Sequence, residues 1–218
     1  MQSIQTVSEN TIYVGASDRR LAKFENLFPI PRGVSYNAYV ILDEKTALLD
    51  TADASVGAQF LENVAAALDG RKLDYLIVDH MEPDHAAMIE AVLVRWPDLR
   101  LVVNAKTLPM LKMYFPTDSA AIDDALVVKE GDTLDLGKHK LTFVMAPMVH
   151  WPEVMMTFDT TTGTLFSADA FGTFGALEGA LFADEVDFAG KWLDDARRYL
   201  TNIVGKYGPH IQLLLKKA

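Results

Sequence analysis

A chain of 218 residues, half of them apolar, is long enough to bury the core of one large domain or two small ones, and it is not an intrinsically disordered segment. Its formal net charge of -10 argues against binding to nucleic acid or to an anionic membrane, because a field of that sign repels both. The absence of cysteine excludes disulfides, zinc–thiolate sites and iron–sulfur ligands, and it fits a cytoplasmic protein.

Neither export nor membrane insertion is expected from the sequence. The first ten residues lack the basic and apolar pattern of a signal peptide. No run of about 18 apolar residues is present that could form a membrane span.

The first half of the chain is predicted to begin with strands and then to alternate strands with helices. Apolar runs bounded by turn residues predict strands at 11–14, 36–42, 46–49, 75–78 and 101–103. Helical spacing of apolar residues predicts helices at 56–68, 86–96 and 107–114. The segment 19–28 is compatible with a short helix or with an irregular arm.

The second half starts again with strands and ends in helices. Strands are predicted at 125–128, 133–136, 141–146, 155–159 and 164–167. Helical spacing recurs over 192–207 and again over 210–217. Strands and helices in two similar halves predict two sheets that pack together with helices outside.

The most informative stretch follows the predicted strand 75–78. Five side chains that can bind metal stand within residues 79–85, namely Asp79, His80, Glu82, Asp84 and His85. A charged loop is usually only solvated, and one His-x-Glu pair would be weak evidence. The whole pattern directly after a buried strand is much more specific, and a mixture of imidazole and carboxylate suits iron, manganese or zinc.

Two later residues are candidate partners of this loop. His150 and Asp169 each stand just beyond the end of a predicted strand. A lone histidine there is more often structural, and a lone aspartate before a glycine loop is usually a turn former. Because loops at the ends of strands carry function in many folds, we expect both side chains to meet the 79–85 loop.

The complete pattern resembles the flavodiiron proteins. It consists of His80-x-Glu82-x-Asp84-His85, then His150 after residues 86–149, then Asp169 after residues 151–168. Flanking stretches match as well, and the resemblance extends over essentially the whole chain. The matching stretches are Asp18-Arg19-Arg20, Phe24-Glu25-Asn26-Leu27-Phe28-Pro29, residues 33–39, Glu82-Pro83-Asp84-His85 and His150-Trp151-Pro152.

The resemblance implies an α/β fold, a metallo-β-lactamase-like αββα sandwich of two mixed β-sheets flanked by helices. This domain would extend over residues 1–218, and its ligands would hold two irons. The resemblance assigns His80, Glu82 and His150 to one iron, Asp84 and His85 to the other, and Asp169 to a bridging position. In some family members the residue equivalent to His85 turns away from the metal.

Glu82 bears on the choice of metal. The hydrolytic zinc relatives of this fold usually carry His-x-His-x-Asp-His, so a carboxylate here replaces an imidazole and favours iron. A dinuclear metal-dependent hydrolase is the alternative function, and zinc could replace iron. A third class is a binding or scaffold domain with a vestigial site, which the completeness of the ligand set disfavours.

Several other residues are candidates for a supporting role, each with a structural alternative. Asp50 ends the predicted strand 46–49 and could accept a hydrogen bond from a metal-binding histidine, or simply form a turn; Asp79 has the same status. Trp151 is expected either to wall the substrate pocket or to pack in the core. His139 is expected on the surface in a polar turn, and His210 is not expected to bind metal.

The sequence also departs from the family. The family has one further histidine in a Ser-His-Gly-like loop well beyond Asp169, followed by a flavodoxin-like domain that binds FMN, and neither is present in the 218 residues. We therefore expect a C-terminally incomplete diiron domain that is inactive alone.

For the longer protein the resemblance implies an oxidoreductase. It would reduce O2 to water or NO to N2O, with electrons from FMN and a rubredoxin-like donor, in a head-to-tail homodimer. The motif does not distinguish O2 from NO.

Overall fold

The computed structural model describes residues 3–116 and 119–217, and its larger sheet has seven strands. In spatial order they are β1 (Gln5–Ser8), β2 (Thr11–Tyr13), β7 (Tyr39–Leu42), β8 (Thr46–Leu49), β9 (Tyr75–Ile77), β10 (Arg100–Asn104) and β11 (Leu126–Val128). The pairs from β1 to β8 are antiparallel, and those from β8 to β11 are parallel. The sheet is therefore mixed.

The second sheet is antiparallel throughout. It has the order β12 (Thr133–Asp135), β13 (Lys140–Met145), β14 (Met155–Asp159) and β15 (Thr164–Phe166). Two small pairs complete the strands, β3 (Ala16–Asp18) with β6 (Val34–Tyr36) and β4 (Lys23–Phe24) with β5 (Phe28–Pro29).

The central strands of the larger sheet are buried on both faces. In β8, Leu48 points into the apolar layer beneath the helices, whereas Ala47 and Leu49 point into the layer between the two sheets. Leu76 and Ile77 of β9 divide in the same way. This explains the continuous apolar runs in the sequence, since a strand covered on both sides needs no polar alternation.

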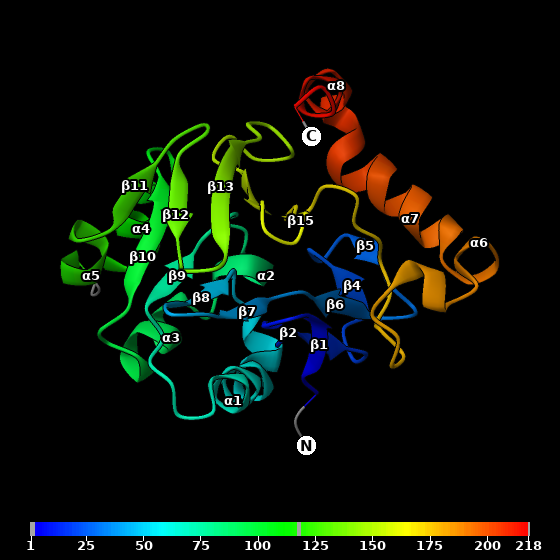
Figure 1. Cartoon of the computed structure of the whole chain (residues 1–218). Coiled ribbons are helices and arrows are strands. Elements are labelled where there is room, and N and C mark those ends of the chain that lie inside the picture. Colours follow the sequence, from blue (N-terminus) through cyan, green and yellow to red (C-terminus); the bar gives the residue numbers. More distant parts are fainter. Residues whose placement is uncertain (1–2, 117–118, 218) are drawn as a thin grey trace.

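Helices cover the outer face of the larger sheet. These are α1 (Gly57–Leu68), α3 (Ile89–Arg95), α4 (Thr107–Tyr114) and α5 (Ser119–Asp123). Figure 1 places α1 and α3 on one side of this sheet and β12 and β13 on the other. The predicted α/β sandwich of two sheets flanked by helices is confirmed.

The C-terminal part forms an arm of short helices beside β15 (Figure 1). It contains η3 (Ala183–Glu185), α6 (Phe188–Lys191), α7 (Leu193–Tyr199), a π-helical turn η4 (Leu200–Val204), η5 (Gly205–Tyr207) and α8 (Gly208–Leu214). The predicted helix over 192–207 is thus interrupted. In the part of the chain that the structure describes, no helix is both long and apolar enough to cross a membrane.

The structure decides one open alternative and corrects two local expectations. The segment 19–28 is the irregular alternative, with the short strands β4 and β5 and no helix. The predicted helix 86–96 is broken into α2 (Pro83–Ala86) and α3, because the hydroxyl of Thr51 accepts a hydrogen bond from the backbone N–H of Met88. The expected strand 36–42 is split between β6 and β7.

His139 is the clearest error of the sequence analysis. It is buried rather than on the surface, with 1% of its area exposed, and its Nδ1 lies 2.8 Å from Oδ2 of Asp159. Its backbone N–H donates to Oδ2 of Asp43, which lies in the connection between β7 and β8. Asp159, 20 positions further along the sequence, pairs with His139 and holds this residue of a polar turn in the interior.

Candidate metal centre

The loop 79–85 takes its shape from the end of β9 and the start of α2 (Pro83–Ala86). The backbone N–H of Asp79 donates to Oδ1 of Asp50, which ends the neighbouring strand β8. Glu82 is extended as the N-cap residue of α2, and Pro83 follows at the first helical position, where its missing N–H costs nothing. Asp84 and His85 then lie in the first turn, so the loop presents side chains in several directions.

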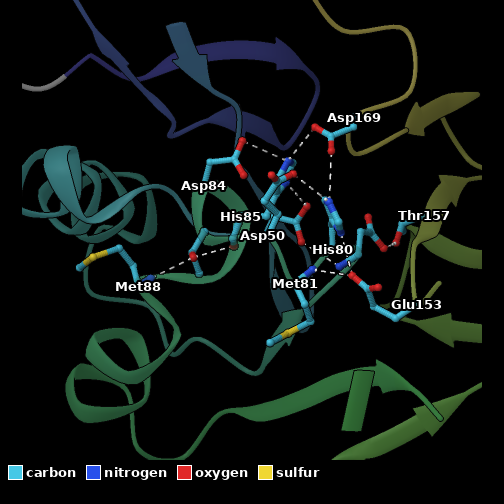
Figure 2. A network of polar contacts seen from close by, with 12 residues as sticks. Asp50, His80, Met81, Asp84, His85, Met88, Glu153, Thr157 and Asp169 are labelled. Carbon is cyan, nitrogen blue, oxygen red and sulfur yellow. Dashed lines mark hydrogen bonds and ion pairs between the residues drawn. The ribbon is translucent and has the colours of Figure 1, made fainter. Parts of the chain in front are cut away.

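The opposite half of the centre comes from the second sheet. His150 lies in the connection between β13 and β14, and Asp169 lies just after β15. Both connections meet the loop 79–85 at one edge of the sandwich, and Figure 2 shows His80, His85 and Asp169 converging there. All six predicted ligands are brought together.

The six residues form two groups that share one member. Group one consists of His80, Glu82, His150 and Asp169, and group two consists of Asp84, His85 and Asp169. In each group one potential ligand atom per residue lies within 4.8 Å of all the others. The division matches the assignment that the family resemblance implied, with Asp169 in the shared position.

The contacts in group one are short. Nε2 of His80 lies 3.3 Å from Oε2 of Glu82 and 3.1 Å from Oδ2 of Asp169. Nε2 of His150 lies 3.0 Å from the same Glu82 oxygen and 3.1 Å from the same Asp169 oxygen. Two imidazole nitrogens therefore face two carboxylate oxygens.

Group two is more open. Nε2 of His85 lies 3.2 Å from Oδ1 of Asp169 and 3.7 Å from Oδ2 of Asp84. The side chain of His85 is 12% exposed, whereas that of His80 is fully buried. His85 faces Asp169 in this chain and is not turned away.

These separations fit a bound cation. Ligand atoms about 2.0–2.2 Å from a metal, at angles between an octahedral and a tetrahedral arrangement, lie about 2.8–3.6 Å apart. Nε2 of His80, Oδ1 of Asp84 and Oδ2 of Asp169 are buried in the described structure without a hydrogen-bond partner. Ligand atoms that all point at one metal ion lie close together without being aligned for hydrogen bonds to one another.

The pKa shifts of the histidines and of Asp84 are consistent with a cation site. Burial lowers the pKa of His80, but the adjacent carboxylates of Asp169, Glu153 and Glu82 outweigh it and raise that pKa well above its usual range. The same balance raises the pKa of His150 to about 9. Burial raises the pKa of Asp84 to about 7. Protons on histidine neutralise the carboxylates, and a divalent cation would displace those protons.

The supporting residues take different places. Oδ2 of Asp50 lies 3.0 Å from Nδ1 of His85. Asp79 is in neither ligand group, and its carboxylate accepts a hydrogen bond from the Thr157 hydroxyl at 2.8 Å. Trp151 packs edge-on against His80 with ring centroids 5.3 Å apart, which corresponds to the packing alternative. His210 lies exposed in α8 beside Tyr207 and belongs to neither group.

Three residues of the centre were missed by the sequence analysis. Glu153 holds Nδ1 of His80 at 2.8 Å, and Tyr199 donates from its hydroxyl to Oδ1 of Asp169 at 2.7 Å. A hydrogen bond with Glu82 raises the pKa of Glu25 to about 8. Only Glu153 had a sequence signal, its position directly after His150-Trp151-Pro152, whereas the other two arrive from distant segments.

A cavity of about 430 Å³ opens beside group two. Its polar side is formed by Asp50, Asp84, His85 and Asp169. Its apolar side is lined by Tyr39, Leu49, Phe166, Phe182 and Trp192. A small uncharged molecule could therefore reach the carboxylate–histidine cluster.

Two packed sheets with a histidine and carboxylate centre at their common edge define a metallo-β-lactamase-like domain. The model of the ODP family beta lactamase matches residues 34–200. A nitric oxide reductase from Moorella thermoacetica is 36% identical over 213 residues, which cover 97% of this chain and 51% of that protein. An anaerobic nitric oxide reductase flavorubredoxin from Klebsiella pneumoniae is 36% identical over 200 residues, which cover 91% and 40%.

Solved structures give the same relationship. The flavodiiron protein from Giardia intestinalis matches with a TM-score of 0.91 and 27% identity, covering 99% of this chain and 51% of that one. Rubredoxin oxygen:oxidoreductase from Desulfovibrio gigas matches with a TM-score of 0.91 and 30% identity, covering 99% and 52%. The chain belongs to the ODP family, the β-lactamase-like domain of flavodiiron proteins. It spans about half the length, or less, of these relatives.

Proposed function

We propose that this chain is the metal-binding domain of an oxidoreductase that reduces O2 to water or NO to N2O at two iron ions. The observation that carries the proposal is the position of Asp169, whose two oxygens face different groups: Oδ2 faces His80 and His150, and Oδ1 faces His85. A carboxylate in that position is suited to join two ions.

The residues define what each ion would receive. His80, Glu82, His150 and Asp169 would hold the first ion, and Asp84, His85 and Asp169 would hold the second. Two irons would supply the electrons and the binding place for O2 or NO. The chain contributes a buried donor set, histidines held in place by Asp50 and Glu153, and the Tyr199 hydroxyl beside the shared carboxylate.

Glu82 separates this proposal from a hydrolase. It faces both His80 and His150, so the position that would carry a third imidazole in the zinc pattern carries charge and a hard oxygen donor instead. Hard oxygen donors favour iron over a nitrogen-only zinc site. The names of the relatives support the same choice, since they include nitric oxide reductases and an oxygen:oxidoreductase.

The remaining parts of the system are proposed from the family resemblance and from the names of the relatives, which include a flavorubredoxin and a rubredoxin oxygen:oxidoreductase. A flavodoxin-like domain carrying FMN, a rubredoxin-like donor and a head-to-tail homodimer would deliver electrons to the irons. We expect residues 1–218 to supply the metal-binding part of that system.

The test is anaerobic loading of the chain with ferrous iron, followed by metal counting and assays of O2 and NO consumption with reduced rubredoxin. Iron bound at the centre, close to two ions per chain, supports the proposal. Binding of zinc alone, together with hydrolysis of esters or phosphodiesters, would contradict it. Loss of iron in the Asp169→Ala variant but not in Asp98→Ala, at an exposed position, would locate the ions.

A further inference from the structure

Glu153 is the only carboxylate among the described residues that hydrogen bonds to His80 from behind, on the side away from the two groups. Its Oε1 lies 2.8 Å from Nδ1 of His80 and 3.1 Å from the backbone nitrogen of Met81. Figure 2 shows Glu153 beside both residues. Both side chains are completely buried. Because a backbone N–H can only donate, this oxygen acts as an acceptor.

The acceptor determines how His80 presents its other nitrogen. A ring that donates from Nδ1 carries a lone pair on Nε2, and Nε2 is the atom that faces Glu82 and Asp169. That atom is buried without a hydrogen-bond partner among the described residues. The tautomer that Glu153 selects is therefore the one that binds a metal through Nε2.

The backbone of Glu153 is itself anchored. Nδ2 of Asn104, at the end of β10, donates to the Glu153 carbonyl at 2.6 Å. Oδ1 of the same Asn104 accepts from the backbone N–H groups of Lys106 and Thr107 at the start of α4. Asn104 thus fixes the loop that carries both His150 and Glu153 against the larger sheet.

The second group has a weaker version of this arrangement. His85 has Asp50 behind it at 3.0 Å, but the two side chains are 12% and 7% exposed. A hydrogen bond in a water-free environment is electrostatically stronger than a similar one near solvent. The two histidines of the loop 79–85 are therefore supported unequally.

We propose that Glu153 is a positioning residue that fixes His80 as an Nε2 ligand and so makes the ion of group one the more tightly held of the two. This inference rests on the proposed function, because it concerns the same metal centre. It assigns a role to a residue outside the six ligands. It also predicts that the two ions respond to different carboxylates.

The experiment compares Glu153→Gln with Asp50→Asn in the 218-residue chain. Gln keeps the shape and an acceptor oxygen but removes the charge, so the fold is maintained, and Asp50→Asn makes the matched change behind His85. Co(II) is titrated without oxygen against a competing chelator. Hyperfine-shifted imidazole N–H signals assign each binding step to His80 or His85.

We expect Glu153→Gln to weaken the group-one ion about 10–100-fold and to change the other less than about threefold. Asp50→Asn should instead weaken binding of the group-two ion and change that of the group-one ion less. An unchanged group-one affinity in Glu153→Gln, or equal losses at both positions, would overturn the role of Glu153. Absence of any Co(II) binding by the unmodified chain would instead refute the proposed function.

A second measurement tests Glu153 even in that case. Nitrogen-correlated NMR of the histidine rings in the metal-free chain, recorded at a pH high enough for His80 to be neutral, should show its remaining proton on Nδ1. A proton on Nε2 of neutral His80 in the unmodified chain would overturn the proposal without reference to any metal.

Discussion

The hydroxyl of Tyr199 donates a 2.7 Å hydrogen bond to Oδ1 of Asp169, the carboxylate that both ligand groups share. Tyr199 ends α7, and Asp169 follows β15, so the C-terminal helical arm reaches the centre through this contact. Both groups are buried, and the bond ties a phenol to the residue on which a two-ion site depends.

Removal of this hydroxyl should therefore destabilise the chain. We expect Tyr199→Phe to lower the free energy of unfolding by about 1.5–3 kcal/mol, because a hydrogen bond to a charged group is lost in a buried place. Urea denaturation of the metal-free chain measures the change. Tyr207→Phe, in the partly exposed η5 turn, is the matched control and should stay within about 0.5 kcal/mol. Equal losses in the two variants would contradict the assignment.

Gly172 allows the Tyr199 ring to approach. A Cβ at this position would lie 2.9 Å from Cε1 and Cζ of that ring. We expect Gly172→Ala to cost about 1–3 kcal/mol through overpacking and to shift the tyrosine absorption, because the ring must move. A Cβ added at Gly208 would meet no atom within 4 Å, so Gly208→Ala should be nearly neutral. Thermal denaturation of both variants measures the two changes in stability.

The stability of the metal-free chain should fall as pH rises above 6.5. The folded chain holds the His150 proton more tightly than the unfolded chain, because hydrogen bonds with Asp169 and Glu82 overcome the effect of burial and raise the pKa from 6.5 to about 9. This stabilisation is complete below pH 6.5 and is lost as pH passes 9. Asp84, whose pKa burial raises to about 7, acts in the same direction from pH 4 to 7.

Urea denaturation of chelator-treated protein at pH 6 and pH 9.5 checks this expectation. The predicted loss is about 1–3 kcal/mol. His150→Gln removes one titrating ring and should make the profile less steep above pH 6.5, while His80, whose pKa is also raised, keeps part of the slope. A profile that stays equally steep in this variant would show that the slope arises elsewhere.

Glu82 should control the choice of metal. Glu82→His restores the imidazole of the hydrolytic zinc pattern, and we expect the zinc-to-iron ratio to rise about tenfold when equal amounts of Fe(II) and Zn(II) compete. Elemental analysis after removal of excess metal gives the ratio. Glu62→His, on the exposed face of α1, adds the same side chain away from the centre and should leave the ratio unchanged.

His139 should matter for folding and not for metal. Replacing it with Ala leaves Asp159 buried without its imidazole partner, and we expect a loss of about 3–5 kcal/mol. The number of ions bound by the folded variant should equal that of the unmodified chain. Loss of an ion in folded His139→Ala would mean that this buried pair communicates with the centre.

The sequence was most informative where chemistry and local geometry coincide. The loop 79–85 could be recognised because it follows a strand, contains a proline at the first helical position and holds five residues that can bind metal. His150 and Asp169 could be placed because strand ends of a packed sandwich meet at an edge. The positions at which β9 and β15 end determine which residues reach that edge.

What could not be predicted depends on contacts between distant segments. Glu153 takes its place behind His80 only when the two sheets pack, whereas the role of Asp50 behind His85 was one of the alternatives expected from the sequence. The break between α2 and α3 required the hydroxyl of Thr51, which arrives from the end of β8. His139 was assigned to the surface because its neighbours are polar, whereas Asp159 draws it inward.

The placement of the centre at the edge shared by the two sheets has a consequence for folding. Glu82 and Asp169 are separated by residues 83–168, so bringing them to one point closes a long loop of chain and costs conformational entropy. An ion held by both would act as a non-covalent cross-link between the two halves. Neither half alone contains a complete group one, so metal uptake should report the docking of the two sheets rather than the formation of either sheet.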